Sequence, residues 1–187
     1  MDQGLVDKLY LMLSGRLGLL DLGGSDVSFD PRISLAHFIT QKDILRFSVG
    51  LYHQFGDYFT LENYDLRAKR AGHVSLTYDR ISDSLDLRLS LYNKEYGNLF
   101  LNRDNRISSE GGGFARGAEC FINWKKPKYD ILLVYNFLHS KRKENEVLRL
   151  TTSPYEISHS FTGIIKYKFN TGSVGLRFSY ATGHKIF

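Results

Sequence analysis

Leu85-Asp86-Leu87-Arg88-Leu89-Ser90-Leu91-Tyr92 decides the fold of this chain, because leucine alternates strictly with a side chain that carries a polar group. Successive side chains of a β-strand point to opposite faces, so all four leucines share one face. An α-helix would distribute the same leucines around its circumference. The stretch therefore predicts a strand that separates an apolar environment from an aqueous one.

The same alternation continues outward from this stretch in both directions. Apolar side chains hold alternate positions in other segments, for example Leu45, Phe47, Val49 and Leu51, or Val174, Leu176, Phe178 and Tyr180. We expect about nine strands, at residues 8–20, 31–40, 44–55, 71–80, 84–96, 113–125, 128–140, 156–169 and 173–183. Strands of soluble proteins average about 5 or 6 residues, whereas a strand that crosses a bilayer needs about 9 to 11.

The connections between these strands alternate in length. Four are expected to be tight turns, at residues 40–43, 81–84, 125–128 and 170–173, and four are expected to be longer polar loops, at residues 21–30, 55–70, 97–112 and 141–154. Outer-membrane barrels have short turns on one side of the membrane and longer loops on the other. The sequence therefore predicts an all-β fold, an antiparallel up-and-down transmembrane β-barrel.

Composition excludes several other classes of protein. The 187 residues include 13 Phe and 12 Tyr, which is far too aromatic for a disordered chain, and no apolar run is long enough for a membrane helix. The net charge of +5 is mild and the basic residues are scattered, so we expect no nucleic-acid binding. The first residues, Met1-Asp2-Gln3-Gly4, lack the features of a signal peptide, so the chain is either cytoplasmic or begins upstream of this start.

Several stretches in order along the chain resemble the barrel of TonB-dependent outer-membrane receptors. They are Gly15-Arg16-Leu17, Asp30-Pro31-Arg32-Ile33-Ser34-Leu35, Ser48-Val49-Gly50-Leu51-Tyr52-His53-Gln54-Phe55, Tyr92-Asn93-Lys94-Glu95-Tyr96-Gly97-Asn98-Leu99, Gly113-Phe114-Ala115-Arg116-Gly117-Ala118-Glu119, Ser153-Pro154-Tyr155 with His159-Ser160-Phe161, and Phe178-Ser179-Tyr180-Ala181-Thr182-Gly183. The resemblance implies a location in the outer membrane of a Gram-negative cell. It also implies that residues 1–187 form a single segment from the middle to late part of a 22-stranded barrel, with no plug domain and no closing strands among them.

That resemblance implies function and partners as well. Such receptors import a scarce ligand, namely a metal chelate, cobalamin or a glycan. The expected partners are the outer-membrane lipid, the imported small ligand, a plug domain, and a periplasmic energy-coupling protein. Polar positions of the strands are expected to face the lumen, and the candidates are Arg46, Tyr52, Arg88, Tyr92 and Asn136. An equally open alternative is a hydrated wall with internal charge pairs around Asp86 and Arg88.

No enzymatic, cofactor-binding or metal-binding motif is found in the sequence. The six histidines, at positions 37, 53, 73, 139, 159 and 184, have no metal-ligand spacing. His159 stands between Ser158 and Ser160, but neighbours in a strand point to opposite faces and cannot form a catalytic pair. Gly111-Gly112-Gly113 is expected to be a flexible loop end, and residues 141–146 a solvated outer loop.

Two other hypotheses remain open at this point. The chain could be a complete small outer-membrane barrel of eight or ten strands that acts as a structural protein, an adhesin or an enzyme, because bacterial single-chain barrels have even strand numbers. It could also be a soluble β-barrel that binds a ligand, since such barrels share the up-and-down topology.

Overall fold

The computed structural model of this chain describes residues 8–21, 25–56, 66–103, 106–144, 147–153 and 156–183. Within them it contains ten strands: β1 (Lys8–Asp21), β2 (Ser25–Phe38), β3 (Asp43–Gln54), β4 (Lys69–Ile81), β5 (Leu85–Arg103), β6 (Arg106–Lys125), β7 (Tyr129–Glu144), β8 (Val147–Thr152), β9 (His159–Phe169) and β10 (Gly172–Ala181). The described residues include no helix with the length and hydropathy needed to cross a bilayer.

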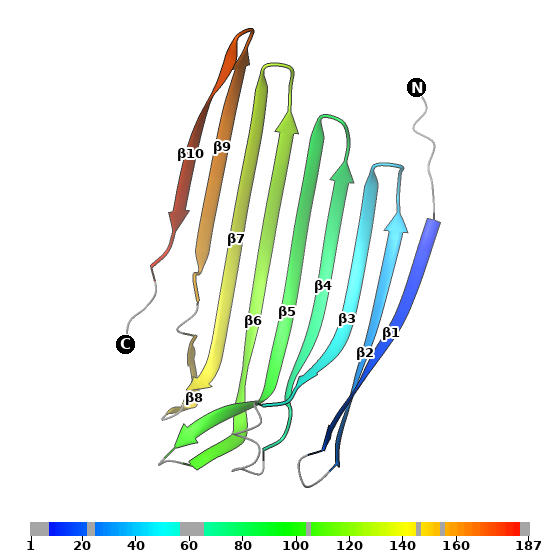
Figure 1. The fold of residues 1–187 in the computed structure, drawn as a ribbon, viewed down its shortest axis with the longest axis vertical. Helices are drawn as coiled ribbons and strands as arrows, with labels where there is room; N and C mark the ends of the chain where they lie inside the picture. Colours follow the sequence, from blue (N-terminus) through cyan, green and yellow to red (C-terminus); the bar gives the residue numbers. More distant parts are fainter. Residues whose placement is uncertain are drawn as a thin grey trace.

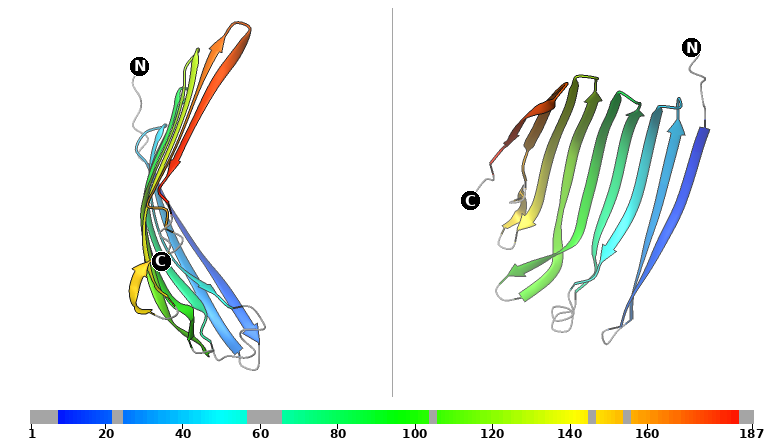
Figure 2. Two further views of the ribbon diagram at one scale, coloured as in Figure 1. Left: turned by 90° about the vertical axis from the view of Figure 1, so that its left-hand side faces the viewer. Right: turned by 45° about the horizontal axis from the view of Figure 1, so that its top comes forward.

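All pairings between the strands are antiparallel, and they build one sheet in the order β1-β2-β3-β4-β5-β6-β7-β9-β10. The short strand β8 lies off this path and pairs with the far end of β7. β1 and β10 lie at opposite margins of the sheet, and among the described residues each pairs on one side only (Figure 1). Figure 2 shows a single curved layer with no second layer packed on it. The predicted all-β, antiparallel up-and-down fold is confirmed.

The two ends of the sheet differ in their connections. Tight turns join β2 to β3, β4 to β5, β6 to β7 and β9 to β10, and all four lie at the end that is uppermost in Figure 1. We call this end the turn end. Backbone hydrogen bonds close the turns, for example from the Lys126 N–H to the Tyr129 carbonyl oxygen at 2.7 Å. β1, β3, β5 and β7 end at the opposite end of the sheet, which we call the loop end (Figure 1).

Three of the four predicted loops are largely strand. β1 and β2 pair as far as Asp21 with Ser25, β5 and β6 pair as far as Arg103 with Arg106, and β8 lies within residues 141–154. These segments were predicted as loops because they are polar and lack alternation. The prediction was wrong because a hairpin outside the apolar band needs backbone pairing but no apolar alternation.

The interpretation of Gly111–Gly113 as a flexible loop end was wrong, because these glycines lie inside β6. A Cβ atom on Gly113 would collide with the Lys141 carbonyl oxygen, so the close approach of β7 to β6 requires glycine. The pairing of β5 with β6 also shifts register between Gly97 and Leu101, and Asn98 has a φ of 54°. The hairpin bends where these irregularities occur (Figure 1).

The sheet has two faces of opposite character, which we call the apolar face and the polar face after Leu89 and Arg88. Leucines on the apolar face are exposed, as Leu17 (72%) and Leu176 (71%) illustrate. The buried hydrophobic residues among those described are few: Leu66, Leu101 and Ala115. A soluble sheet would bury its apolar face against a second layer, so this face requires an apolar surrounding.

Residues that lie opposite one another on successive strands form rows across the sheet. The apolar side chains form a band that crosses these rows obliquely. One row begins at the apolar Phe47 on β3 and ends at the polar His159 on β9. This row therefore leaves the apolar band as it approaches β9. A row nearer the turn end begins at Arg80 on β4 and ends at Phe178 on β10, so it enters the band toward β10. Strands that are tilted against a bilayer produce this relation between band and rows.

Candidate functional site

The five side chains that the sequence predicts to line a lumen all lie on the polar face. Arg46 on β3 and Asn136 on β7 belong to one row that runs through Thr77, Ser90 and Glu119. Arg88, Tyr92 and Tyr52 occupy alternate positions on the same side of their strands. Their common face follows from the alternation in the sequence, whereas their contact with a lumen or a ligand stays a prediction.

The side chains of Arg46 and Arg88 both contact the carboxylate of Asp79, which was not predicted from the sequence as a site residue. Asp79 on β4 is 2% exposed and lies directly opposite Arg88, whose Nε donates to Asp79 Oδ1 at 2.6 Å. Arg46 Nη2 donates to the other oxygen, Asp79 Oδ2. Two guanidinium groups therefore hold one carboxylate, and the cluster keeps a net positive charge.

The hypothesis of a charge pair around Asp86 and Arg88 needs correction. Asp86 accepts a hydrogen bond from Asn123 Nδ2 at 3.2 Å and lies 3.7 Å from Lys125 Nζ. Arg88 turns instead to Asp79, because Asp79 is its cross-strand neighbour whereas Asp86 is two positions away along the same strand.

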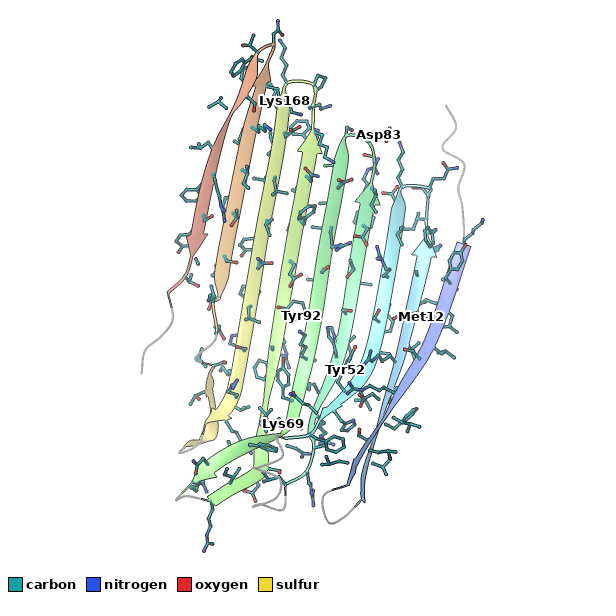
Figure 3. The ribbon with its side chains drawn as sticks, viewed as in Figure 1. Met12, Tyr52, Lys69, Asp83, Tyr92 and Lys168 are labelled. Atoms are coloured by element: carbon teal, nitrogen blue, oxygen red, sulfur yellow. The ribbon has the colours of Figure 1, made fainter. Side chains whose placement is uncertain are left out.

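The ring of His73 lies between the rings of Tyr52 and Tyr92, so three rings follow one another across β3, β4 and β5. The ring centroid of His73 on β4 lies 6.4 Å from that of Tyr52 and 6.4 Å from that of Tyr92. Arg32 on β2 stacks on Tyr52 at 4.4 Å, and the Lys94 ammonium lies 5.2 Å from the Tyr92 centroid. We call these five residues the aromatic row. Tyr52 and Tyr92 both lie toward the loop end (Figure 3).

The aromatic row presents cations and ring faces together on one polar surface. The Arg32 Nε is buried and has no hydrogen-bond partner among the described residues. Tyr92 extends over Gly117 of β6, where a Cβ atom would collide with its ring and hydroxyl. Guanidinium, ammonium, phenol and imidazole groups bind anions and planar rings by hydrogen bonds and by cation–π contact.

A second buried carboxylate stabilises the place where β3 separates from β2. Pairing between these strands ends at Arg32 with Gly50, although β1 and β2 continue together. Asp30, which is 0% exposed, accepts the N–H of His53 at 2.9 Å and lies 2.8 Å from His53 Nδ1. Its other oxygen, Oδ2, accepts a hydrogen bond from Arg16 Nε at 2.9 Å and forms an ion pair with the same guanidinium. The carboxylate thus replaces the missing backbone partner.

In the described part of the chain, Asn136 makes no hydrogen bond with Asp79 or with the aromatic row, but it lines a shallow hollow in the polar face together with the Asp79 cluster. The hollow has a volume of about 520 Å³, and its lining includes Asp79, Arg88, Glu119, Phe121 and Asn136. Asn136 Nδ2 donates to Ser160 Oγ at 3.2 Å. The structure therefore brings together four of the five predicted residues in two pairs, and it places Asn136 near Arg88 at the hollow.

Glu156 forms a polar cluster at the loop end, outside the strands. Its carboxylate accepts the Ser140 N–H at 2.6 Å and the Ser158 hydroxyl at 2.8 Å, and it lies 3.7 Å from His139 Nδ1. Burial alone would raise the pKa of this carboxyl, but the hydrogen bonds and the nearby His139 outweigh it and hold the pKa of Glu156 below its usual value.

His159 does not meet either neighbouring serine. Its Nδ1 lies 2.8 Å from the Tyr135 hydroxyl, whereas Ser158 donates to Glu156 and Ser160 accepts from Asn136. Within the described ranges, no three His, Cys, Asp or Glu side chains lie close enough together to hold a metal ion. Cys120 has a half-buried position on β6. Five of the six histidines lie in the described residues and form no cluster that could hold a metal ion there, and His184 lies outside those residues.

Four residues of these clusters were not predicted from the sequence as site residues: Asp30, Arg32, His73 and Asp79. Asp79 and His73 are on the polar side of a segment whose alternation is plain in the sequence, so their face was readable. Their partners were not, because register across strands determines which polar side chains meet.

Comparison with known proteins gives a result at the level of the fold. No family model matches the sequence, and no curated protein matches it. Solved structures do match: Fiu, the ferric-catecholate import receptor of E. coli K12, has a TM-score of 0.65 and 16% identity over 81% of this chain. The FrpB iron transporter of Neisseria meningitidis has a TM-score of 0.69 and 12% identity over 82% of this chain.

A third example is FyuA, the ferric yersiniabactin uptake receptor of Yersinia pestis, with a TM-score of 0.65 and 13% identity over 84% of this chain. The chain spans only 24% of the length of Fiu, 27% of FrpB and 26% of FyuA. All three are TonB-dependent receptors. The sheet of this chain therefore has the fold of one segment of the barrel of TonB-dependent outer-membrane receptors.

Proposed function

We propose that this chain is a wall segment of an outer-membrane receptor that imports a scarce ligand, and that it works with a plug domain and a periplasmic energy-coupling protein. The observation that carries the proposal is an open sheet with one exposed apolar face and one charged face, which matches about a quarter of the length of solved import receptors. The apolar face would contact lipid, and the polar face would line the path of the ligand.

Strand direction argues against direct closure of the described sheet on itself. The path β1 to β10 contains nine strands in the described residues, so β1 and β10 run in the same direction. An antiparallel barrel alternates strand directions all the way round, so an odd number of further strands must separate β10 from β1. Direct pairing of β10 with β1 would therefore be parallel, so the nine strands of this path do not close on themselves, and a ten-stranded barrel would need one further strand between these margins.

The exposed apolar face also speaks against a soluble binding module. Such a module turns its apolar side chains inward, and a soluble monomer rarely exposes a large apolar patch. Here the apolar face is exposed from β1 to β10, as Leu13 (67%) and Val174 (62%) show.

Among the three classes of ligand, the polar face favours an anionic metal chelate. The aromatic row supplies a stacked guanidinium, an ammonium and three rings, and the Asp79 cluster retains a net positive charge. A neutral glycan needs aromatic platforms but no surplus of cations. Fiu and FyuA, whose names refer to ferric-catecholate import and ferric yersiniabactin uptake, share the fold.

The first test is the size of the native protein. An antibody against residues 141–150, used on blots of outer membranes from the source cell, should reveal a band several times larger than 21.5 kDa. A band near 21.5 kDa would refute the segment proposal and make the small closed barrel the leading hypothesis.

The second test concerns the ligand. Arg32→Gln in the complete receptor should weaken binding of an anionic ferric chelate about tenfold, because a charge-assisted contact is worth about 1.5 to 3 kcal/mol. Arg177→Gln removes the same charge from the polar face of β10, away from the aromatic row, and serves as the control. Equal binding by both variants would contradict the role of the row, and tighter binding of cobalamin or a glycan would assign the ligand to that class.

A further inference from the structure

The sheet opens between β2 and β3 toward the loop end. The pairing of these two strands ends at Arg32 with Gly50, whereas each strand continues beyond that point to pair with its other neighbour, β1 or β4. We call this opening the fork, and its sides are residues 25–31 of β2 and 51–54 of β3. Figure 1 shows the two strand pairs diverging there. Among the described residues, each side of the fork therefore pairs with one strand only.

A proline explains where the fork begins. Pro31 is the first residue of β2 beyond the last pair with β3, and proline has no N–H to donate to a ladder. The fork lies within the apolar band, because Val27 and Phe29 on one side and Leu51 on the other are exposed apolar side chains. Open strand edges are costly in hydrocarbon, so this edge requires compensation.

Side chains bridge the fork where backbone pairing is missing. Asp30 Oδ1 accepts the His53 N–H at 2.9 Å, and Arg16 donates to both sides, from Nε to Asp30 Oδ2 at 2.9 Å and from Nη2 to the His53 carbonyl oxygen at 2.8 Å. Phe55 reaches from the end of β3 to β1, where a Cβ atom on Gly18 would lie 3.4 Å from its ring. Side chains can separate without breaking the ladders on either side, so this closure is reversible.

The large apolar side chains beside the fork do not cover it. Phe29 lies over Gly15 of β1, where a Cβ atom would be 2.9 Å from its ring. Leu51 lies toward Gly72 of β4 on the other side, with 3.8 Å between its Cδ2 and the position of a Cβ atom there. Two glycines thus allow Phe29 and Leu51 to turn away from each other, one on each side of the fork.

The aromatic row begins at the closed end of the fork, on the polar face. Arg32 belongs to the last pair of β2 with β3, and its guanidinium stacks on Tyr52 at 4.4 Å. Gly50 provides the room, because a Cβ atom there would lie 3.1 Å from Arg32 Cγ and 3.2 Å from Tyr52 Cε2. A head group bound to this stack would therefore have the fork beside it and the apolar band beyond.

We propose that the fork is a lateral portal for the acyl tail of an amphipathic ligand, an anionic metal chelate whose head group binds the aromatic row and whose tail passes between β2 and β3 into the bilayer. This inference rests on the proposed function, whose ligand class it narrows. A ligand without a tail gains nothing from an open edge within the apolar band, and an unbroken ladder would serve it better. For an amphipathic ligand, the portal keeps the tail in an apolar surrounding while the head group reaches the polar face.

The test uses the complete receptor in lipid nanodiscs and two synthetic ferric catecholate probes, one with a dodecyl tail and one without. After subtraction of binding to empty nanodiscs, the tailed probe should bind about tenfold more tightly, because burial of two methylene groups accounts for such a factor. Gly15→Ala should remove most of this difference, since the added methyl group displaces the Phe29 ring from its place over β1. Gly72→Ala, across the fork, should preserve it, because the added methyl group only touches Leu51. Heat-modifiable migration in gels checks that both variants are folded.

A diazirine at the end of the dodecyl tail locates the tail in the unaltered receptor. Mass spectrometry should find the photolabel on residues 25–31 and 51–55. Label spread evenly over the apolar face, β10 included, would overturn the inference, because the tail would then lie in bulk lipid. Label confined to the polar face would overturn it too, because the tail would then stay inside the wall.

The binding measurements separate this inference from the proposed function. Equal binding of the two probes, or a preference for the tailed probe that Gly15→Ala leaves unchanged, would refute the portal and leave the proposed function in place. Failure of both probes to bind the receptor would refute the metal-chelate class itself, and the portal with it.

Discussion

The two faces of this sheet are built from the same strands, yet they reverse the usual order of a soluble protein. On the apolar face, leucines are exposed, as Leu17 (72%) illustrates, and they do not pack against a second layer of structure. On the polar face, Asp30 and Asp79 are the largest fully buried side chains among the described residues. Buried carboxylates require partners, and each has arginine. The two fully buried carboxylates and their arginine partners thus lie on the polar face, while the centre of the other face is lined by exposed apolar side chains.

The largest expected effect comes from placing a charge on the apolar face. Leu76→Arg on β4 should destabilise the complete barrel by about 2 to 4 kcal/mol in lipid vesicles, because the side chain would enter the hydrocarbon. Ser75→Arg, one position away on the polar face, should cost less than about 1 kcal/mol. Denaturant titration of both variants measures the difference. Equal costs would show that the face of Leu76 does not contact lipid.

A smaller effect is expected from crowding at the centre of the polar face. Gly117→Ala should cost about 1 to 3 kcal/mol, because its Cβ atom would displace the Tyr92 ring and meet the Phe137 carbonyl oxygen. Gly175→Ala on β10 should be nearly neutral, since its nearest contact is the Ile165 carbonyl oxygen at 3.7 Å. Thermal unfolding of both variants provides the comparison. A neutral Gly117→Ala would mean that Tyr92 does not occupy this position.

The Asp79 cluster tests whether the polar face is held together by specific pairs. Asp79→Asn should cost about 1 to 2 kcal/mol, because the half-exposed guanidinium groups of Arg46 and Arg88 lose their counter-charge but keep access to water. Addition of Arg88→Gln to that variant should cost little more. A double-mutant cycle measures the coupling, and strictly additive costs would rule out the pair.

The smallest effect lies at the loop end, beyond both faces. Glu156 has a lowered pKa in the folded chain, so its contribution to stability is present above the usual glutamate pKa and is lost as the pH falls through the folded value. Glu156→Gln should therefore remove about 1 kcal/mol at pH 7 and nothing at a pH where the carboxyl is protonated. Unfolding measured across pH 3 to 7 checks this, and an effect independent of pH would contradict it.

Most of the fold could be predicted from alternation alone. The four leucines of residues 85–91 and the equivalent positions in the other strands define the apolar face without any knowledge of pairing. The extensions of β5, β6 and β7 beyond the band were missed, because no alternation is required there. Glycines such as Gly113, which appeared to mark a loop, instead permit strands to approach closely.

For the candidate site, the sequence predicted which residues lie on the polar face but not which of them contact one another. Arg46, Arg88, Tyr52 and Tyr92 were identified from their position on polar sides of strands. Their linkage through Asp79 and His73 depends on which residues lie opposite one another, and a register is determined by turn geometry together with the whole sheet. The alternation can be read from a single sequence, whereas the register of the strands is known only from the folded sheet.

Each strand on the path pairs with its nearest neighbour along the chain, apart from the insertion of β8 beside β7. Assembly can therefore proceed one hairpin at a time, with the last strand added serving as the template for the next. At each stage the newest edge, such as β10, offers unpaired N–H and C=O groups to any passing chain. Each added hairpin pairs with the edge that the previous hairpin left open, so the open edge moves along the sheet in the order of the sequence.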